Sequence, residues 1–504
     1  MARLFIFAIG GTGSRVLRSL TMLLASGITQ KTDNTYEIVP IIIDPHKANE
    51  DLKRTLRVLD TYQSITEEVG INNGFFNTRI STLQSLAANK QKFQGSFTFD
   101  LQEVSNSRFR DYIGYNTMDK PNQALANLLF SGQSINKRGE DVDLLDIEMD
   151  IGFVGNPNVG SVVLNQFKDS DEFKQFASSF NEDDRIFIIS SIFGGTGAAG
   201  FPTILKNIRG AMGNSTIDSK GFLQDSKIGA LTVLPYFNVE KDESSPIQTS
   251  DFIAKTKAAL HYYKDNVTGN QSVNALYYIA DSYNGKSYKN DPGDGGQKND
   301  AHFVELASAL AIIDFMGIPD RQLQTAEGRA INPIYKEFGT KADNEALTLL
   351  ELGNQSQDIL NLRLSQFFFF HKYMQEKLTS SIDKQAWSTD SPEIKKAFLS
   401  TAFYKNYIAD FFSFYDEWLE ELARNRRGFS PFNIKSNLEA SIKGIEPEKG
   451  WFKDKVDYGF YDNKLNSISK GRQYASSSEK LIKLFFEATD EILTKKFAHF
   501  KVKA

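Results

Sequence analysis

The chain has 504 residues with a formal net charge of −5, and 40% of them are hydrophobic. This length exceeds what one hydrophobic core usually holds, so we expect at least two domains. The charge provides no general basic field, which argues against nucleic acid as a partner. The absence of cysteine excludes thiol catalysis, disulfides and cysteine-based zinc sites. No run of about 18 apolar residues is present, so we expect a cytoplasmic protein without a membrane span.

The first segments of the chain follow the order strand, glycine turn, helix, strand. Residues 3–9 (RLFIFAI) have the composition of a buried strand, and GGTGS at 10–14 forms a turn. The residues that follow repeat leucine and valine at helical spacing, and EIVPIIID at 37–44 is a second apolar strand that ends in an acid. This order is the opening of an α/β nucleotide-binding fold.

Further strands and a second glycine loop follow at greater distance. Residues 184–193 (DRIFIISSIF) predict a strand that leads into a glycine loop and a helix, and 227–237 and 275–281 predict two more strands. Residues 301–317 predict a helix that is apolar on every face and therefore buried. The run FFFF at 367–370 is typical of a core or an interface.

The domain organisation follows from where these patterns weaken. We expect a nucleotide-binding domain over 1–320, with a large insertion at about 50–150. Beyond about 320 the pattern is mostly helical, so we expect a mainly helical C-terminal domain over 321–504. We expect the basic run RNRR at 424–427 to be a solvated patch.

The two glycine loops, GGTGS and GGTGA, both lie between a strand and a helix. A phosphate needs backbone N–H donors at close range, which glycine permits and a helix N-terminus supplies. The alternative for either loop alone is a tight strand-to-helix turn. Gly195, Gly197 and Gly200 also match the dehydrogenase pattern G-x-G-x-x-G, but this loop does not open the first strand–helix–strand unit. The first loop lacks the third glycine, with Val16 in its place, so the dehydrogenase reading is disfavoured.

Five segments resemble the tubulin/FtsZ superfamily of GTPases and occur in that family's order: FAIGGTGSRV, IIIDPHKANEDL, GFVGNPNVG, FGGTGAAGFP and LTVLPYFNVE. The fourth resembles the family signature GGGTGTGAAP, with Phe193 in place of its first glycine and Ala199 in place of its last. The resemblance covers most of residues 1–320. It implies an α/β fold with a Rossmann-like, mostly parallel sheet. The insertion and the helical C-terminal region suggest a divergent prokaryotic branch.

The resemblance implies GTP or GDP with Mg²⁺ as the ligand. Thr196 would add a hydroxyl to the phosphate contacts, and Asn156 and Gly160 would face the terminal phosphate. Asp44 would hold Mg²⁺ directly or through water, since this cation prefers carboxylate oxygens near phosphate. Glu240 would accept the ribose hydroxyls. The glycine loops would wrap the phosphates through the backbone amides of Gly10, Gly11, Thr12, Gly13, Gly194, Gly195, Thr196, Gly197 and Ala198.

In this family the start of the central helix reads the base, beside a stacking aromatic side chain. Here that region contains Asn299, Asp300, His302, Phe303 and Glu305. We expect Glu305 to accept the two adjacent N–H groups of guanine, with Asp300 as the second candidate. Phe303 or His302 would stack on the ring. A carboxylate on an apolar helix is costly without a partner, which favours such a role for Glu305.

One family motif, N-x-D-x-x-D/E, is missing. In the family it follows the central helix and completes the neighbour's active site in a filament. Residues 317–333 (GIPDRQLQTAEGRAINP) do not contain it, and Asp320 and Glu327 are the nearest catalytic candidates. Two functions therefore stay open. One is a GTPase that self-assembles head to tail into filaments. The other is a nucleotide-binding scaffold or switch with little hydrolysis, acting through a protein partner that the C-terminal region could contact.

Overall fold

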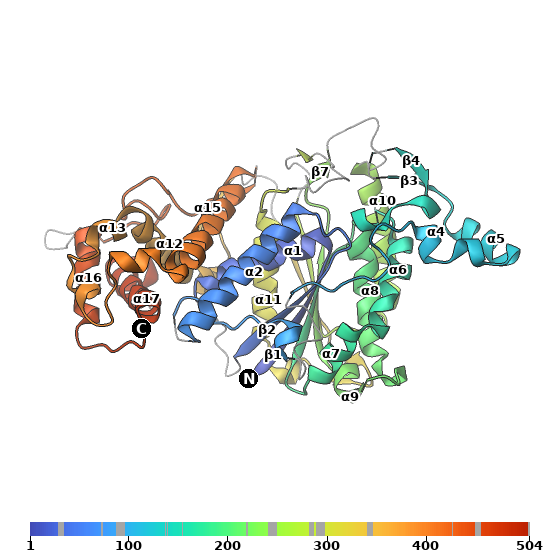
Figure 1. The fold of residues 1–504 in the computed structure, drawn as a ribbon, viewed down its shortest axis with the longest axis horizontal. Helices are drawn as coiled ribbons and strands as arrows, with labels where there is room; N and C mark the ends of the chain where they lie inside the picture. The colour runs from blue at the N-terminus through green and yellow to red at the C-terminus, as the bar shows by residue number, and fades with distance from the viewer. Residues whose placement is uncertain are drawn as a thin grey trace.

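A six-stranded parallel sheet forms the centre of the larger part of the molecule, in the order β12-β8-β6-β5-β1-β2 (Figure 1). Its strands are β1 (Ala2–Ile9), β2 (Tyr36–Ile43), β5 (Arg185–Ser191), β6 (Lys227–Val233), β8 (Ala275–Ala280) and β12 (Ile334–Gly339). This computed structural model describes residues 1–28, 35–71, 74–86, 96–136, 138, 140–153, 155–217, 220–239, 249–281, 287–288, 298–339, 346–425, 427–448 and 455–501.

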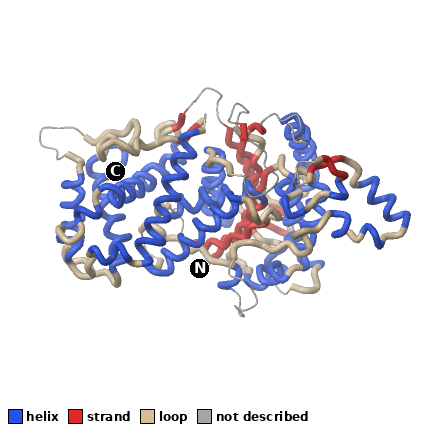
Figure 2. Tube along the Cα trace, turned by 45° about the horizontal axis from the view of Figure 1, so that its top comes forward, coloured by secondary structure: helices blue, strands red, loops and turns tan. Residues whose placement is uncertain are grey.

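Helices cover both faces of the sheet, as Figure 2 shows. Alternate residues of β1 face two different cores, because successive side chains of a strand point to opposite faces. Leu4 and Ile6 join the core formed with α1, α2 and α11, whereas Phe5 and Phe7 join the core formed with α6, α7 and α8. The bounds of these helices are α1 (Gly10–Ala25), α2 (Glu50–Val69), α6 (Pro157–Leu164), α7 (Asp171–Ser179), α8 (Gly195–Arg209) and α11 (Phe303–Gly317).

The predicted insertion at 50–150 is narrower in the structure. Helix α2 packs on α1 in the core, and residues 79–81 and 97–99 pair with β2 through backbone hydrogen bonds. Only the later part projects from the body, where α4 and α5 form a lobe at the right of Figure 1. The elements of this segment are α3 (Leu83–Leu86), α4 (Phe109–Tyr112), α5 (Lys120–Leu129), β3 (Gln133–Ile135) and β4 (Asp141–Asp143).

The boundary at residue 320 also differs from the prediction, because β12 lies beyond it and belongs to the sheet. Shorter elements surround the body: α9 (Lys220–Gln224), α10 (Thr249–Tyr263), and the paired strands β7 (Asn238–Val239) with β9 (Ser287–Tyr288), β10 (Thr325–Ala326) with β11 (Arg329–Ala330), and β13 (Ala346–Leu347) with β14 (Gly428–Phe429).

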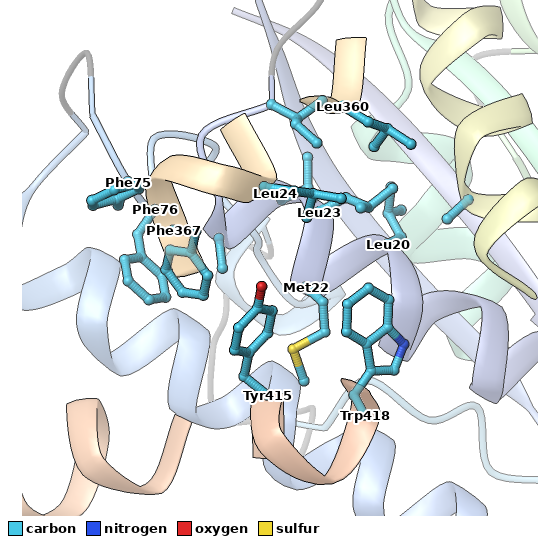
Figure 3. Close-up of a cluster of buried hydrophobic side chains, with 14 of the residues drawn as sticks. Leu20, Met22, Leu23, Leu24, Phe75, Phe76, Leu360, Phe367, Tyr415 and Trp418 are labelled. Atoms are coloured by element: carbon cyan, nitrogen blue, oxygen red, sulfur yellow. The ribbon is translucent and has the colours of Figure 1, made fainter. Parts of the chain in front are cut away.

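The C-terminal region is helical, as predicted, and shares one hydrophobic core with the body. Figure 3 shows Met22 of α1 beside Tyr415 and Trp418 of α15, with Phe367 of α12 close by. All four phenylalanines of the run 367–370 are buried, so this run is core. The helices of this region are α12 (Asn354–Glu376), α13 (Leu378–Ser381), α14 (Ala386–Thr389), α15 (Ala409–Arg424), α16 (Tyr458–Ser469) and α17 (Ser477–Lys496).

The α/β class with a parallel sheet and a helical C-terminal region is thus confirmed, and the arrangement is consistent with a Rossmann-like fold. Within the part of the chain that the structure describes, no helix is both long enough and apolar enough to cross a membrane.

Candidate functional site

Three helices begin side by side at the carboxyl edge of the sheet. A Cβ atom on Gly10, at the start of α1, would lie 3.5 Å from Cβ of Thr196 in α8. A Cβ atom on Gly195 would lie 3.0 Å from the backbone nitrogens of Gly155 and Asn156, which precede α6. Strands β1 and β5 are neighbours, and the chain continues from them toward opposite edges of the sheet. Such a switch point is where ligands bind in open α/β sheets.

None of these three helices is capped by a side chain of its N-cap residue, and none has an acid in its first turn. Their N-cap residues are Ile9, Asn156 and Gly194. By contrast, the neighbouring α2 and α11 are capped by Asn49 and His302. The first N–H groups of an uncapped helix need an external acceptor, and the positive end of the helix dipole favours an anion. The three starts together suit a phosphate chain.

Three of the glycines predicted to contact phosphate have a separate packing role. A Cβ atom on Gly13 or Gly197 would lie 2.6 Å from a backbone atom of the strand that precedes its helix. A Cβ atom on Gly160 would lie 2.8 Å from Cβ of Ala199, where α6 crosses α8. Close approach of helix to strand, or of helix to helix, therefore requires these glycines. Their contacts with phosphate stay predictions.

The accessible part of the loops is a rim of half-buried residues: Gly11, Gly155, Asn156, Gly194 and Thr196. The amide of Asn156 donates to the Ser134 hydroxyl at 3.3 Å, which ties the rim to the projecting lobe. Gly10 has a left-handed φ of +69°, so glycine is required there for the turn. The remaining predicted loop residues are buried in the first turns: Gly10, Thr12, Gly13, Gly195, Gly197 and Ala198.

Asp44 follows β2 and is buried beside the first glycine loop. Its Oδ1 accepts the His46 N–H at 3.0 Å. Burial raises the pKa of Asp44 to about 7, and the Asp51 charge adds to the rise, whereas the His46 N–H and Arg15 oppose it. Among the described residues, no group of three or more His, Asp or Glu side chains could hold a metal ion alone. A Mg²⁺ ion at Asp44 would therefore need further ligands from water or a bound molecule, and its binding there stays a prediction.

Arg15, the residue directly after the first glycine loop, is the centre of a buried polar network that the sequence analysis did not predict. Its Nε donates to Glu305 at 2.6 Å, its Nη1 to Asp51 at 3.1 Å and its Nη2 to the Tyr236 hydroxyl at 2.9 Å. The Tyr236 hydroxyl in turn donates to Glu305 at 2.8 Å. Burial raises the pKa of Tyr236 well above its ordinary value, so the hydroxyl keeps its proton. The network joins α1, α2 and α11.

Glu305, the predicted reader of guanine, has three partners within the protein. It binds Arg15 and Tyr236, and its Oε2 accepts the His302 N–H at 3.1 Å in a capping box. Phe303 lies in a different environment, against the rings of Phe338 and Phe429. The structure therefore does not bring Phe303 and Glu305 together, because side chains two positions apart on a helix diverge by about 200°. Base recognition by either residue stays a prediction.

Three other residues at the start of α11, named in the sequence analysis for base recognition, contact other parts of the protein. The Asp300 carboxylate accepts a hydrogen bond from Arg424 at 3.0 Å, and the side-chain amide of Asn299 donates one to Asp51 at 2.9 Å. The ring of His302 packs against Tyr236 with centroids 4.8 Å apart. Glu240, predicted to contact ribose, lies outside the described residues.

The two catalytic candidates lie away from the glycine loops. Asp320 binds Arg185 at 2.6 Å and Lys227 at 3.2 Å, and these are the first residues of β5 and β6, at the amino edge of the sheet. Burial works to raise the pKa of Asp320, but hydrogen bonds and charges from both cations outweigh it and lower the pKa. Glu327 is exposed in the turn of the β10–β11 hairpin, with φ +51°. The catalytic roles stay predictions.

The basic run at 424–427, which we expected to be a solvated patch, fits that expectation only in part: the Arg424 side chain is about half exposed, whereas Arg427 is not. Arg427 is buried and its Nε lies 3.1 Å from Asp281, the residue after β8.

Lys255 of α10 was not predicted to lie near the site, but its Nζ donates to the Gly155 carbonyl at 2.8 Å, beside the half-buried rim. One signal was available for Arg15 and also for Arg18, because cations in the helix that follows a glycine loop need partners if that helix is buried.

Comparison with known proteins adds little to this geometry. No family model matches the chain, and no curated protein matches it. Among solved structures, the chain is similar to CetZ from Methanosaeta thermophila strain DSM 6194, with 12% identity over 63% of this chain and a TM-score of 0.22. The match spans about half of that protein, 52% of its length. At this TM-score the likeness gives no ground for assigning a fold or a function.

Proposed function

We propose that this chain is a GTP-binding protein of the tubulin/FtsZ type. The observation that carries the proposal is the meeting of three uncapped helix N-termini at the switch point of the sheet. The first turns of α1 and α8 would donate backbone N–H groups to the phosphates, and the start of α6 would approach the terminal phosphate. Gly11, Gly194 and Thr196 are half-buried, so the rim is the part of the loops that such a ligand would contact first.

Asp44 would hold Mg²⁺ at this site. A divalent cation stabilises the ionised carboxylate, which burial otherwise disfavours, and so offsets the cost that raises its pKa to about 7. The choice of guanine over adenine rests on the family resemblance. If the start of α11 forms the base side of the site, as the family resemblance implies, the buried polar network of Arg15, Tyr236 and Glu305 would fix its shape.

The primary form of the proposal is a GTPase that assembles head to tail. Its support is the position of Asp320 at the amino edge of the sheet, opposite the glycine loops, so that stacked copies would bring one edge onto the other. The second form is a nucleotide-binding switch with little hydrolysis. It is favoured by the ion pairs of Asp320 with Arg185 and Lys227, which lower its pKa and make the carboxylate a poorer base.

One experiment separates the two forms. Purified full-length protein is mixed with GTP and Mg²⁺, and bound nucleotide, phosphate release and light scattering are followed together. Binding with phosphate release and scattering supports the assembling GTPase, and Asp320→Asn should then reduce phosphate release but not binding. Binding without phosphate release supports the switch. Absence of binding to any guanine nucleotide at micromolar concentration overturns both forms.

A further inference from the structure

Residues 299–302, which lead into α11, are held between two parts of the chain that are far apart in sequence. On one side is α2, in the nucleotide-binding body. On the other side is the last turn of α15, in the C-terminal region. The segment borders the glycine-loop helix α1, because Glu305 in the first turn of α11 binds Arg15.

The contacts from α2 hold the first residue of the segment. The backbone N–H of Asn299 donates to Asp51 at 3.1 Å, and its carbonyl accepts Arg54 at 2.7 Å. Arg54 and Asp51 also pair with each other at 2.8 Å.

The contacts from the end of α15 hold the remaining residues. Glu421 accepts the backbone N–H of Ala301 at 2.9 Å, and the Asn425 amide donates to the Ala301 carbonyl at 2.6 Å. Arg424 binds Asp300 at 3.0 Å. The C-terminal region therefore binds both the backbone N–H and the carbonyl group of Ala301, two residues before α11 begins.

Glu421 is also the last member of a series of buried ion pairs that begins at Arg15, beside the first glycine loop. Arg15 pairs with Asp51, Asp51 with Arg54, and Arg54 with Glu421, which also binds Arg18 of α1. All five side chains of this series are buried.

Attachment of the C-terminal region does not require these charges. The apolar core already runs without interruption from α1 to α12 and α15, as Figure 3 shows. Buried ion pairs add little net stability compared with apolar side chains of the same size, but they fix one geometry because a displaced charge loses its partner. Because these buried ion pairs are concentrated at residues 299–302, we infer that they fix the position of this segment.

We propose that the end of α15, through Glu421, positions residues 299–302, which the proposed function places at the base-side wall of the nucleotide site, so that nucleotide binding and docking of the C-terminal region reinforce each other. This inference rests on the proposed function. Glu421 contacts the wall and not the phosphate loops, so it acts as a positioning residue. By thermodynamic linkage, a nucleotide that binds the positioned wall must in turn stabilise the end of α15.

The first test compares two variants of α15. In Glu421→Gln the buried charge is removed at nearly constant size, and in Glu420→Gln the exposed neighbouring charge is removed as a control. Affinities for GTP and for inorganic tripolyphosphate are measured on full-length proteins. We expect Glu421→Gln to weaken GTP binding at least about fivefold and to change tripolyphosphate binding less than about twofold, with Glu420→Gln unchanged for both. Equal losses for both ligands, or no loss, would overturn the inference.

The second test uses the unmodified chain and does not depend on how a variant folds. Hydrogen exchange of the backbone amides at 421–425 is measured with and without GTP and Mg²⁺. We expect slower exchange with nucleotide at these residues and no change in α16. Unchanged exchange at 421–425 in a protein that demonstrably binds GTP contradicts the inference alone. A protein that binds no nucleotide contradicts the proposed function as well, so the two failures are distinguishable.

Discussion

Two helices of the C-terminal region, α16 and α17, begin differently from α1 and α8 at the carboxyl edge of the sheet. Helices α16 and α17 are capped by Asp457 and Ser476, whose side chains accept backbone N–H groups at 2.9 and 3.1 Å. Helices α1 and α8 begin with Gly10 and Gly195, and neither has a side-chain cap. A side-chain cap satisfies N–H groups that otherwise need another acceptor. Helix α12 also begins without such a cap, at Gly353, so what distinguishes α1, α6 and α8 is that their three uncapped starts meet at one place, which suits an anionic ligand.

The C-terminal region and the edge of the sheet at the glycine loops also differ in the kinds of side chain that are buried there. The C-terminal region packs aromatic rings closely, as in the pair Phe368 and Phe432, stacked 4.1 Å apart. Around the glycine loops, buried apolar side chains such as Ile9 are joined by a group of buried charges, Arg15, Asp51 and Glu305. Substitutions in the aromatic core of the first region, away from Glu421 at the end of α15, should therefore change stability alone, and those in the second should change ligand binding.

The largest effect is expected from Phe367→Ala in the aromatic core. Phe367 is fully buried against Phe75, Phe411 and Tyr415. The cavity left by this substitution should lower the free energy of unfolding by about 3–5 kcal/mol, measured by denaturant titration. The affinity of the folded protein for GTP should not change. Phe222→Ala, at an exposed position, is the matched control. A loss of GTP affinity in folded Phe367→Ala would break the separation between the two regions.

The next effect is expected from Gly195→Ala at the start of α8. The added methyl group would lie 3.0 Å from the backbone nitrogens of Gly155 and Asn156, so the loops must move apart where phosphate would bind. We expect at least a tenfold loss of GTP affinity, about 1.4 kcal/mol, by calorimetry. Alanine favours a helix over glycine, so α8 itself should persist.

Gly213→Ala is the control for this variant, because nothing lies within 4 Å of its added methyl group. Gly197 is a poorer choice for the test, since its Cβ atom would lie 2.6 Å from the Ser191 carbonyl oxygen and disturb the fold itself. Normal GTP binding by Gly195→Ala would argue against the phosphate role of this loop.

A smaller effect is expected from Ser476→Ala at the start of α17. Loss of the cap should lower the free energy of unfolding by about 1 kcal/mol, measured by thermal or denaturant unfolding. GTP affinity should stay the same. If it fell together with stability, the C-terminal helices would contribute to the site more widely than through the end of α15.

The smallest signal is expected from the protonation of Asp44. Its pKa of about 7 in the free protein lies above the ordinary value, so its protonated form contributes stability that is lost as pH rises through 7. Binding of GTP with Mg²⁺ should ionise it and release about half a proton per chain at pH 7, falling toward zero near pH 8.5. Calorimetry in buffers of different ionisation enthalpy measures this release. An Asp44→Asn variant with the same proton release would exclude Asp44 as its source.

The strands and glycine loops could be predicted because their signals are local. The buried strand 184–193 and the loop after it form a continuous pattern, and β5 with the start of α8 matches it. The charge network could not be predicted, because Arg15 and Glu305 are 290 positions apart and meet only when α1 packs on α11. Arg427 gave the wrong expectation for the same reason: its partner Asp281 is distant in sequence.

The insertion was overestimated although part of it has a local signal. Helix α2 carries buried Leu52 and Leu59 at helical spacing, with Ile65 also buried, so this helix could have been predicted from the sequence. Residues 79–81 and 97–99 add to the sheet edge only through short pairings with β2, too short to give a strand pattern.

The most direct test of the central claim is calorimetric titration of the full chain with GTP in the presence of Mg²⁺, with Gly195→Ala and Gly213→Ala measured alongside. The uncapped helix starts predict binding of GTP at micromolar or lower Kd, weakened at least tenfold by Gly195→Ala and unchanged by Gly213→Ala. Absence of GTP binding, or recovery of NAD from the purified protein in its place, would contradict the account.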